Sequence, residues 1–470
     1  MGKVNHRSMR LFDDKLTERQ QKFINDFSIA YNNKFKSSKK WIDEKRFIYC
    51  DWMNALTFKK SIKELIFPIF SKRSKGAHFE DIDGNILTDI AMGYGVNFWG
   101  HNSDFIKEAI LRRLEMGIEL GPQLKLSAEV AELISELTGC ERVAFCNSGT
   151  EAVMTAIRIA RGKTAKSKIA IFKNSYHGTF DGVLGVGDGK SVEPISIGTS
   201  VNYVKDLYLL DYGKDESLEF IKKNKKEIAA VMVEPVQSRN PGLVPVEFLQ
   251  KLRDITEKNN IALIFDETIT GFRIHPAGAQ GYFNVRADLV IYGKALGGGM
   301  PISAVAGKDS YMQLLDGGVW QFGDESIPHD NVIFHAGTYY KHPLSVAAAK
   351  SSLTEIKKRK DTVYEKMRNN MKYLADSLNN YFADEKIPLR LDFFESMFRF
   401  FGLGKYELAL EPVELDLLFK ILIYNDVYTW EKRTCFISDA HTKEDIDKII
   451  ASFKKSVETL RNGGFEFIID

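Results

Sequence analysis

Short apolar runs alternate with amphipathic segments through the middle of the chain. Between roughly residue 103 and residue 300, each apolar run has the length of a buried strand, and the segments between the runs have helical spacing. The strand-like runs are RVAFC (142–146), KIAIF (168–172), AAVMVEPV (229–236), IALIFDE (261–267) and ADLVIYG (287–293). This alternation predicts an α/β fold with a mainly parallel sheet flanked by helices.

The two ends of the chain follow other patterns. Residues 15–48 are polar and lysine-rich with helical spacing in places, and Asp83-Gly84 separates two short runs as the turn of a hairpin does. Beyond residue 345 the chain is rich in helical segments, followed by short strand-like pieces and a last helix. We therefore expect an N-terminal segment (1–102), a large domain (103–344) and a smaller α+β domain (345–470).

Composition argues against several classes of function. The 470 residues include 65 Lys and Arg against 63 Asp and Glu, and a net charge of +2 gives no reason to expect nucleic acid or a membrane surface as a partner. No apolar run approaches the roughly 20 residues that span a bilayer, and the first residues lack a signal-peptide core. The four cysteines form no CxxC pair, which is typical of reduced thiols. We therefore expect a cytoplasmic protein.

Charged residues that follow the strand-like runs are the first candidates for chemistry, because ligands of open α/β sheets bind at the carboxyl ends of strands. Asp266 follows five apolar residues. It is either a helix cap or structural ion pair, or a carboxylate that keeps a pyridinium nitrogen protonated. Lys294 follows ADLVIYG and precedes a run of glycines. It is either a solvated loop lysine or an amine that forms a Schiff base.

Two turns add candidates of another kind. Ser148, Gly149 and Thr150 stand between the run ending at residue 146 and a helical segment, where amides and hydroxyls can bind an anion or simply cap the helix. Tyr176 and His177 follow KIAIF, where the tyrosine could stack on a planar ligand and the histidine could equally be structural. A site for pyridoxal 5′-phosphate (PLP) requires a phosphate cup, a stacking ring, a carboxylate and an amine, and these candidates supply all four. Such a site needs no metal ion.

Two rival classes fit the sequence less well. The segment GVGDGKS (185–191) ends like a phosphate-binding P-loop, but that motif requires a glycine where Leu184 stands, and LGVGDG is only part of a dinucleotide-binding motif that opens no helix. A scaffold that has lost its activity would be expected to lack Lys294 or Asp266, and both are present.

With these residues in place, the chain resembles the class III, fold-type I PLP-dependent aminotransferases over nearly its whole length. The matching motifs are NSGTEA (147–152), YHG (176–178), VEPVQ (233–237), FDETITGFR (265–273), GKALGGGMP (293–301) and AGTYYKHPL (336–344). The resemblance implies the PLP-dependent transferase fold type I and a homodimer with shared active sites. It also implies that Thr338 contacts the phosphate of the partner's cofactor.

The same resemblance implies the roles of the individual residues. Lys294 would hold PLP and move the proton, Asp266 would bind the ring nitrogen and Tyr176 would stack. The residues expected to contact the cofactor are Ser148, Gly149, Thr150, Tyr176, His177, Asp266, Ile269, Lys294 and, from the partner, Thr338.

Within class III, the chain is most similar to the branch that holds glutamate-1-semialdehyde aminomutases and the aminotransferase domains of polyketide and nonribosomal-peptide synthetases. LTFKKSIKELIFP (56–68) stands where aminomutases carry a GVNSPVR-like segment, and Tyr94 stands where they carry tryptophan. WEKRTCF (430–436) replaces a longer loop. The synthetase type is the closer match.

These differences suggest a substrate. We expect an aminotransferase that moves an amino group from glutamate or glutamine to a keto acyl compound, with an acyl carrier protein as a partner. The alternatives are glutamate-1-semialdehyde 2,1-aminomutase and, more remotely, a non-catalytic scaffold of this fold. Tyr94, Glu431 and Arg433 are the expected substrate-binding residues, Arg433 because a guanidinium can bind a carboxylate through two hydrogen bonds. The alternative is that WEKR is only a solvated turn.

Overall fold

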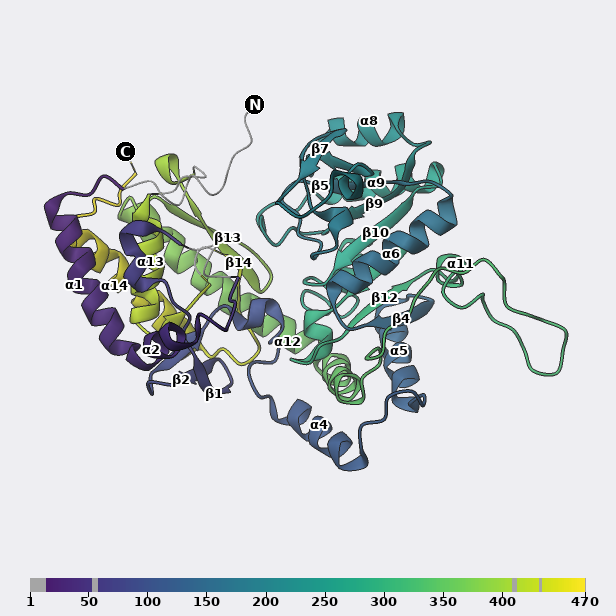
Figure 1. Ribbon diagram of the computed structural model, residues 1–470, viewed down its shortest axis with the longest axis horizontal. Coiled ribbons are helices and arrows are strands. Elements are labelled where there is room, and N and C mark those ends of the chain that lie inside the picture. Colours follow the sequence, from purple (N-terminus) through teal and green to yellow (C-terminus); the bar gives the residue numbers. More distant parts are fainter. Residues whose placement is uncertain (1–13, 53–57, 408–411, 431–432, 470) are drawn as a thin grey trace. The chain divides into compact units, whose positions relative to one another are not determined.

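The computed structural model describes residues 14–52, 58–407, 412–430 and 433–469 (Figure 1). These residues form two compact units. Unit 1 contains the residues up to Tyr94, Trp99–Ser103 and the residues from Met367 onward, and unit 2 contains Gly95–Phe98 and Asp104–Lys366. One helix, α12 (Pro343–Asp384), belongs partly to each unit and passes residue 344, so the expected domain boundaries stay a prediction.

Unit 2 is built on a seven-stranded sheet. The strand order is β4-β12-β11-β10-β9-β5-β8, and β12 runs antiparallel to both of its neighbours while the other pairs are parallel. The strands are β4 (Arg142–Cys146), β5 (Lys168–Phe172), β8 (Leu207–Leu210), β9 (Ile228–Val233), β10 (Ala262–Glu267), β11 (Leu289–Tyr292) and β12 (Ser303–Gly307). The α/β fold with a mainly parallel sheet is confirmed.

Helices cover both faces of this sheet. Alternate residues of a strand point to opposite sides, so each face presents apolar side chains that a helix layer buries. Ile169 and Ile171 of β5 lie in one core cluster with the small residues of α6 (Gly149–Thr164). Phe172 points to the other face, where its ring lies 5.6 Å from that of Phe248 in α9 (Val246–Lys258). The helices on both faces hold the strands in place. Because β4, β5, β9, β10 and β11 run in the same direction, the residues at their carboxyl ends lie at one edge of the sheet.

The remaining elements of unit 2 surround the sheet. A small hairpin pairs β6 with β7, and a long loop between α11 and α12 extends away from the rest of the unit (Figure 1). The other elements are α4 (Asp104–Met116), α5 (Lys125–Thr138), η4 (Asp181–Val183), β6 (Gly185–Asp188), β7 (Ser191–Pro194), α7 (Val201–Val204), α8 (Asp215–Lys223), α10 (Gly278–Phe283), η5 (Lys294–Gly297) and α11 (Asp309–Met312).

Unit 1 contains two small sheets and its own apolar core. One sheet has the order β1-β2-β3-β15 and includes the predicted hairpin, and the other has the order β13-β14-β16. The elements are α1 (Glu18–Lys34), α2 (Lys36–Lys45), η2 (Lys60–Leu65), β1 (Ser71–Lys75), β2 (His78–Asp81), β3 (Ile86–Asp89), η3 (Met92–Gly95), β13 (Leu389–Phe394), β14 (Met397–Gly402), η6 (Gly404–Glu407), α13 (Val413–Tyr424), β15 (Val427–Tyr428), β16 (Cys435–Phe436) and α14 (Lys443–Asn462).

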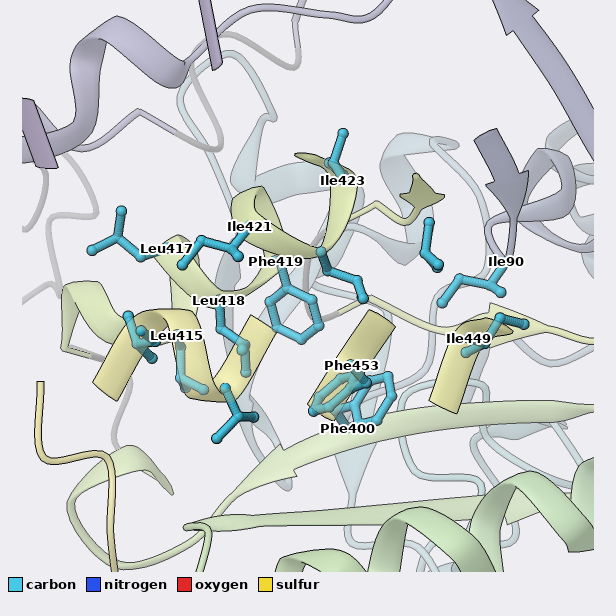
Figure 2. Close-up of a cluster of buried hydrophobic side chains, with 14 of the residues drawn as sticks. Ile90, Phe400, Leu415, Leu417, Leu418, Phe419, Ile421, Ile423, Ile449 and Phe453 are labelled. Atoms are coloured by element: carbon cyan, nitrogen blue, oxygen red, sulfur yellow. The ribbon is translucent and has the colours of Figure 1, made fainter. Parts of the chain in front are cut away.

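The core of unit 1 is formed where two helices pack on β14. Phe419 of α13, Phe453 of α14 and Phe400 of β14 are all buried and meet in this cluster (Figure 2). The rings of Phe400 and Phe453 are stacked with their centroids 4.8 Å apart. Among the helices that the structure describes, none has both the length and the apolar character needed to cross a membrane.

Candidate active site

Asp266 lies in the centre of the sheet edge of unit 2, near the end of β10. Asp266 is only 5% exposed, and its Oδ2 lies 2.7 Å from Nδ1 of His177. The Thr268 amide (3.2 Å) and hydroxyl (2.6 Å) both donate to Oδ1. Burial alone would raise the pKa of Asp266, but the hydrogen bonds and the charge of His177 lower it below its usual value. Asp266 is therefore an ionised carboxylate that is already fixed in position.

Lys294 follows the neighbouring strand, β11, and begins the short helix η5. Its φ of 43° lies in the left-handed region, a conformation that non-glycine residues adopt mainly where the surrounding structure requires it. Burial lowers the pKa of the Lys294 amine to about 8, against the opposing charges of Glu234 and Asp266, while Arg273 lowers it further. The amine therefore has a larger neutral, nucleophilic fraction near physiological pH than an ordinary lysine has, although the protonated form still predominates.

The predicted anion cup lies where α6 begins. Ser148 is its N-cap and accepts a hydrogen bond from the Glu151 amide (3.3 Å), so the capping role is real. Thr150 Oγ1 accepts from the Thr179 amide at 3.1 Å, which ties this turn to the turn after β5. Gly178 lies against the same threonine with φ of 83°, and a Cβ there would lie 2.5 Å from Thr150 Oγ1. The first amides of α6 and the helix dipole make this turn suited to a phosphate.

Tyr176 and His177 differ in burial although they are neighbours. Tyr176 is 51% exposed, which leaves area for stacking, whereas His177 is buried beside Asp266. The Tyr176 amide donates to Oε1 of Glu234 at 3.0 Å, and the guanidinium of Arg239 lies 5.9 Å from the centroid of the ring. Tyr176 is thus fixed through its backbone while its ring remains accessible.

Thr338 is placed differently from the other predicted cofactor residues. Ser148, Gly149, Thr150, Tyr176, His177, Asp266 and Lys294 lie at strand ends or turns of one sheet edge, and Ile269 lies in the turn after β10. Thr338 is exposed on the long loop that extends from unit 2, and within the described part of the chain no hydrogen bond joins it to those residues. This placement agrees with a role in a second copy of the chain and does not test it.

Two of the predicted substrate residues belong to an aromatic cluster in unit 1. Tyr94 is 43% exposed, and its ring lies 4.6 Å from that of Trp430. The guanidinium of Arg433 lies 5.0 Å from the centroid of the Trp430 ring, and Trp52 meets the same ring at 5.8 Å. Among the contacts of the described residues, the buried Nε of Arg433 has no hydrogen-bond partner. The third predicted substrate residue, Glu431, lies outside the described residues.

Sequence reasoning missed three polar residues of unit 2. Glu234 and Gln237 are buried in the turn after β9, and Glu234 lies close enough to His177 and Asp266 for their charges to act on its pKa, which burial raises. Arg273 is buried with its guanidinium 5.5 Å from the centroid of the Phe98 ring, and burial lowers its pKa to about 9. A signal was available, because all three stand inside the motifs VEPVQ and FDETITGFR.

A family model described as aminotransferase class-III matches residues 60–389 of the chain. The chain belongs to the class III aminotransferase family. A curated glutamate-1-semialdehyde 2,1-aminomutase of Nitrosopumilus maritimus (strain SCM1) is 34% identical over 410 residues, which cover 84% of this chain and 94% of the relative. The predicted family is thereby confirmed.

Solved structures agree with this assignment. A transaminase with PLP bound matches this aminotransferase with a TM-score of 0.77 and 25% identity, over 85% of this chain and 93% of that chain. A glutamate-1-semialdehyde-aminomutase from Pseudomonas aeruginosa PAO1 in complex with PMP has a TM-score of 0.80 at 21% identity, over 94% and 98%, and shows the fold alone. The cofactor of this class III aminotransferase is PLP, as predicted.

The residues of this aminotransferase fit that cofactor. PLP supplies an aldehyde that condenses with amines and a ring that accepts electrons from the bonds broken next to it. Lys294 presents an amine with a lowered pKa, and Asp266 presents an ionised carboxylate suited to a protonated ring nitrogen. The turn at Ser148–Thr150 suits the phosphate. Tyr176 leaves half of its side chain accessible to a planar ring.

Proposed function

We propose that this aminotransferase moves an amino group between an amino acid and a carbonyl compound, with PLP held by Lys294. The observation that carries the proposal is the pairing of two groups on adjacent strands. Asp266 and Ile291 are register partners of β10 and β11, and Lys294 follows three residues after Ile291. The Lys294 amine can therefore accept and return a proton beside the group that Asp266 keeps protonated, and near neutral pH its pKa of about 8 suits both steps.

Glutamate-1-semialdehyde is the first candidate substrate, converted by exchange of its amino and carbonyl positions. The support is the name of the relatives, which are 34% identical over most of both chains. In such a reaction one compound both gives and receives the amino group, so the substrate must stay bound while its two ends react in turn.

A keto acyl compound is the second candidate, with glutamate or glutamine as the amino donor. The specific observation in its favour is the cluster of Trp52, Tyr94, Trp430 and Arg433 in unit 1. Large aromatic rings suit an apolar acyl chain better than a small polar semialdehyde, and Arg433 would bind the carboxylate of the donor. A carrier protein that presents the acyl group would be a further partner.

One experiment separates the two candidates. The purified enzyme, loaded with PLP, is given glutamate-1-semialdehyde alone or a β-keto acyl thioester of a carrier protein with glutamate or glutamine. Formation of 5-aminolevulinate supports the first candidate, and an amine on the thioester supports the second. Lys294→Ala serves as the control for reactions that do not use the enzyme. If neither product forms and no amino acid converts bound PLP to PMP, the proposal of amino-group transfer on these substrates is wrong.

We further propose that two copies of the chain share their active sites, as the class III family is generally dimeric. The long loop between α11 and α12 carries Thr338 together with exposed apolar side chains, of which Phe322 is 92% exposed and Val319 80%. Apolar side chains exposed to this degree are typical of a protein interface. In the proposed dimer the loop packs on the second copy and brings Thr338 to the phosphate there.

A further inference from the structure

The turn after β9 contacts the backbone of the segment that carries Tyr176. Gln237 donates through Nε2 to the carbonyl oxygen of Lys173 (2.8 Å) and to the hydroxyl of Ser175 (3.0 Å). Glu234 accepts from the Tyr176 amide at 3.0 Å. Two side chains from one turn therefore hold the segment Lys173–Tyr176 at three of its residues.

The turn itself is well fixed. The second carboxylate oxygen of Glu234, Oε2, accepts from the Ser238 amide at 3.1 Å, so the glutamate connects its own turn to the neighbouring segment. Glu234 is 5% exposed and Gln237 is 1% exposed. Hydrogen bonds to such deeply buried groups are costly to break, because the freed groups cannot turn to water.

The Tyr176 side chain gains order from this arrangement although only about half of the residue is buried. Half of the residue is accessible, so packing alone does not define the orientation of its ring. The backbone hydrogen bond to Glu234 and the approach of Arg239 to the ring restrict the conformations that the side chain adopts before any ligand binds. A stacking ring that is already oriented costs less entropy when the cofactor binds.

We propose that Glu234 and Gln237 are positioning residues that hold Tyr176 in the orientation in which it stacks on PLP. This inference rests on the proposed stacking role of Tyr176. Neither residue touches the reacting atoms in this scheme, and both act through the segment Lys173–Tyr176.

The first test measures PLP binding by the apo-protein in a double-mutant cycle. Gln237→Ala should raise the PLP dissociation constant about threefold to tenfold, since a net hydrogen bond changes an equilibrium constant by about that factor. Tyr176→Ala should raise it by a similar factor or more. In the Tyr176→Ala background, Gln237→Ala should have little further effect, because it acts through the missing ring.

The outcomes distinguish the stacking role of Tyr176 from the positioning role of Gln237. If Tyr176→Ala binds PLP as well as the unaltered protein, the stacking role is wrong and the inference falls with it. If Tyr176→Ala weakens binding but the effect of Gln237→Ala is fully additive to it, Tyr176 stacks and the positioning role of Gln237 is wrong.

The second test needs no cofactor. Amide hydrogen exchange in the apo-protein should be faster at Tyr176 in Glu234→Ala than in Glu234→Gln, which keeps an acceptor oxygen. Ser175→Ala removes only one of the contacts of Gln237 and is the mild control if the larger changes impair folding. Exchange at Tyr176 that is unchanged in Glu234→Ala would contradict the positioning role. A third measurement uses the protein loaded with PLP. The circular dichroism of bound PLP should change in Gln237→Ala, since it reports the surroundings of the cofactor ring.

Discussion

The sheet edge of unit 2 and the aromatic cluster of unit 1 are built in opposite ways. At the sheet edge, Asp266 is almost fully buried and has three hydrogen bonds to His177 and Thr268. In the cluster, Tyr94 is 43% exposed, and its ring contacts that of Trp430 edge-on at 4.6 Å. The protein thus fixes the groups proposed for the cofactor in advance, as electrostatic catalysis requires. It leaves Tyr94, proposed for the substrate, far more exposed than Asp266.

The largest effect should come from Lys294. Lys294→Ala should lower turnover by roughly 10²–10⁴-fold, because it removes both the proton carrier and the covalent attachment of PLP. Reduction with borohydride should attach PLP to Lys294 in the unaltered enzyme, and peptide mapping identifies the site. Lys341→Ala is the matched control, since Lys341 lies on the exposed loop and contacts Gln123. An adduct on Lys341 or Lys190 would show that Lys294 has been misassigned.

Asp266→Asn should follow with a loss of roughly 10²–10³-fold in kcat, the range seen when one preorganised electrostatic group is removed. A neutral amide cannot keep a ring nitrogen protonated, whereas its shape and its contacts to Thr268 are nearly conserved. Thermal unfolding checks that the fold is intact, and single-turnover kinetics isolate the proton transfer. Turnover close to that of the unaltered enzyme would remove Asp266 from its proposed role.

A mixed dimer tests the proposed role of Thr338. A dimer of Thr338→Ala with Lys294→Ala should keep one of its two sites with both groups intact, because each site draws Thr338 from the other copy. Its activity should therefore be about half of that of the unaltered dimer, and each parent homodimer should have less. A mixed dimer without any activity would contradict shared sites.

The aromatic cluster should affect substrate rather than cofactor. Arg433→Lys should raise KM for the donor about tenfold, because an ammonium cannot make the paired hydrogen bonds of a guanidinium, while the PLP dissociation constant should not change. Tyr94→Phe is the milder companion variant, which keeps the ring contact to Trp430. A change in PLP affinity with an unaltered KM would show that the cluster serves the cofactor rather than the substrate.

The smallest effect concerns pH. Burial lowers the pKa of the Lys294 amine from 10.5 to about 8, so PLP uptake by the apo-protein should rise as pH increases through about 8, where the amine loses its proton. The charged groups facing this amine are Glu234, Asp266 and Arg273. Glu234→Gln removes a negative charge and should shift the midpoint to lower pH, whereas Gln237→Ala should leave it in place. A common midpoint for both variants would exclude the influence of Glu234 on Lys294.

The sequence predicts the sheet edge well because its strands are short apolar runs that end in polar residues. It does not predict β12, since Ser303–Gly307 is made of small residues and lacks the apolar pattern of the other strands. The contact of His177 with Asp266 joins residues 89 positions apart, and no local pattern encodes it. The positions of Glu234 and Gln237 are likewise set by the packing of the turn, although their motif was recognised. In the cluster, Trp52 escaped notice because isolated aromatics are common in this chain, and Trp430 was considered only as part of the segment WEKR.

The position of β12 also bears on how the protein is made. β4 is an edge strand, and β12 is its one partner in the seven-stranded sheet of the described chain. During synthesis, β4 and the start of α6 emerge from the ribosome long before β12, while β5, β8, β9, β10 and β11 can already pair with one another. Pairing over so long a separation is slow. PLP should therefore find its complete phosphate turn only after residue 307 has been added, so the cofactor can stabilise the finished sheet but cannot guide its early folding.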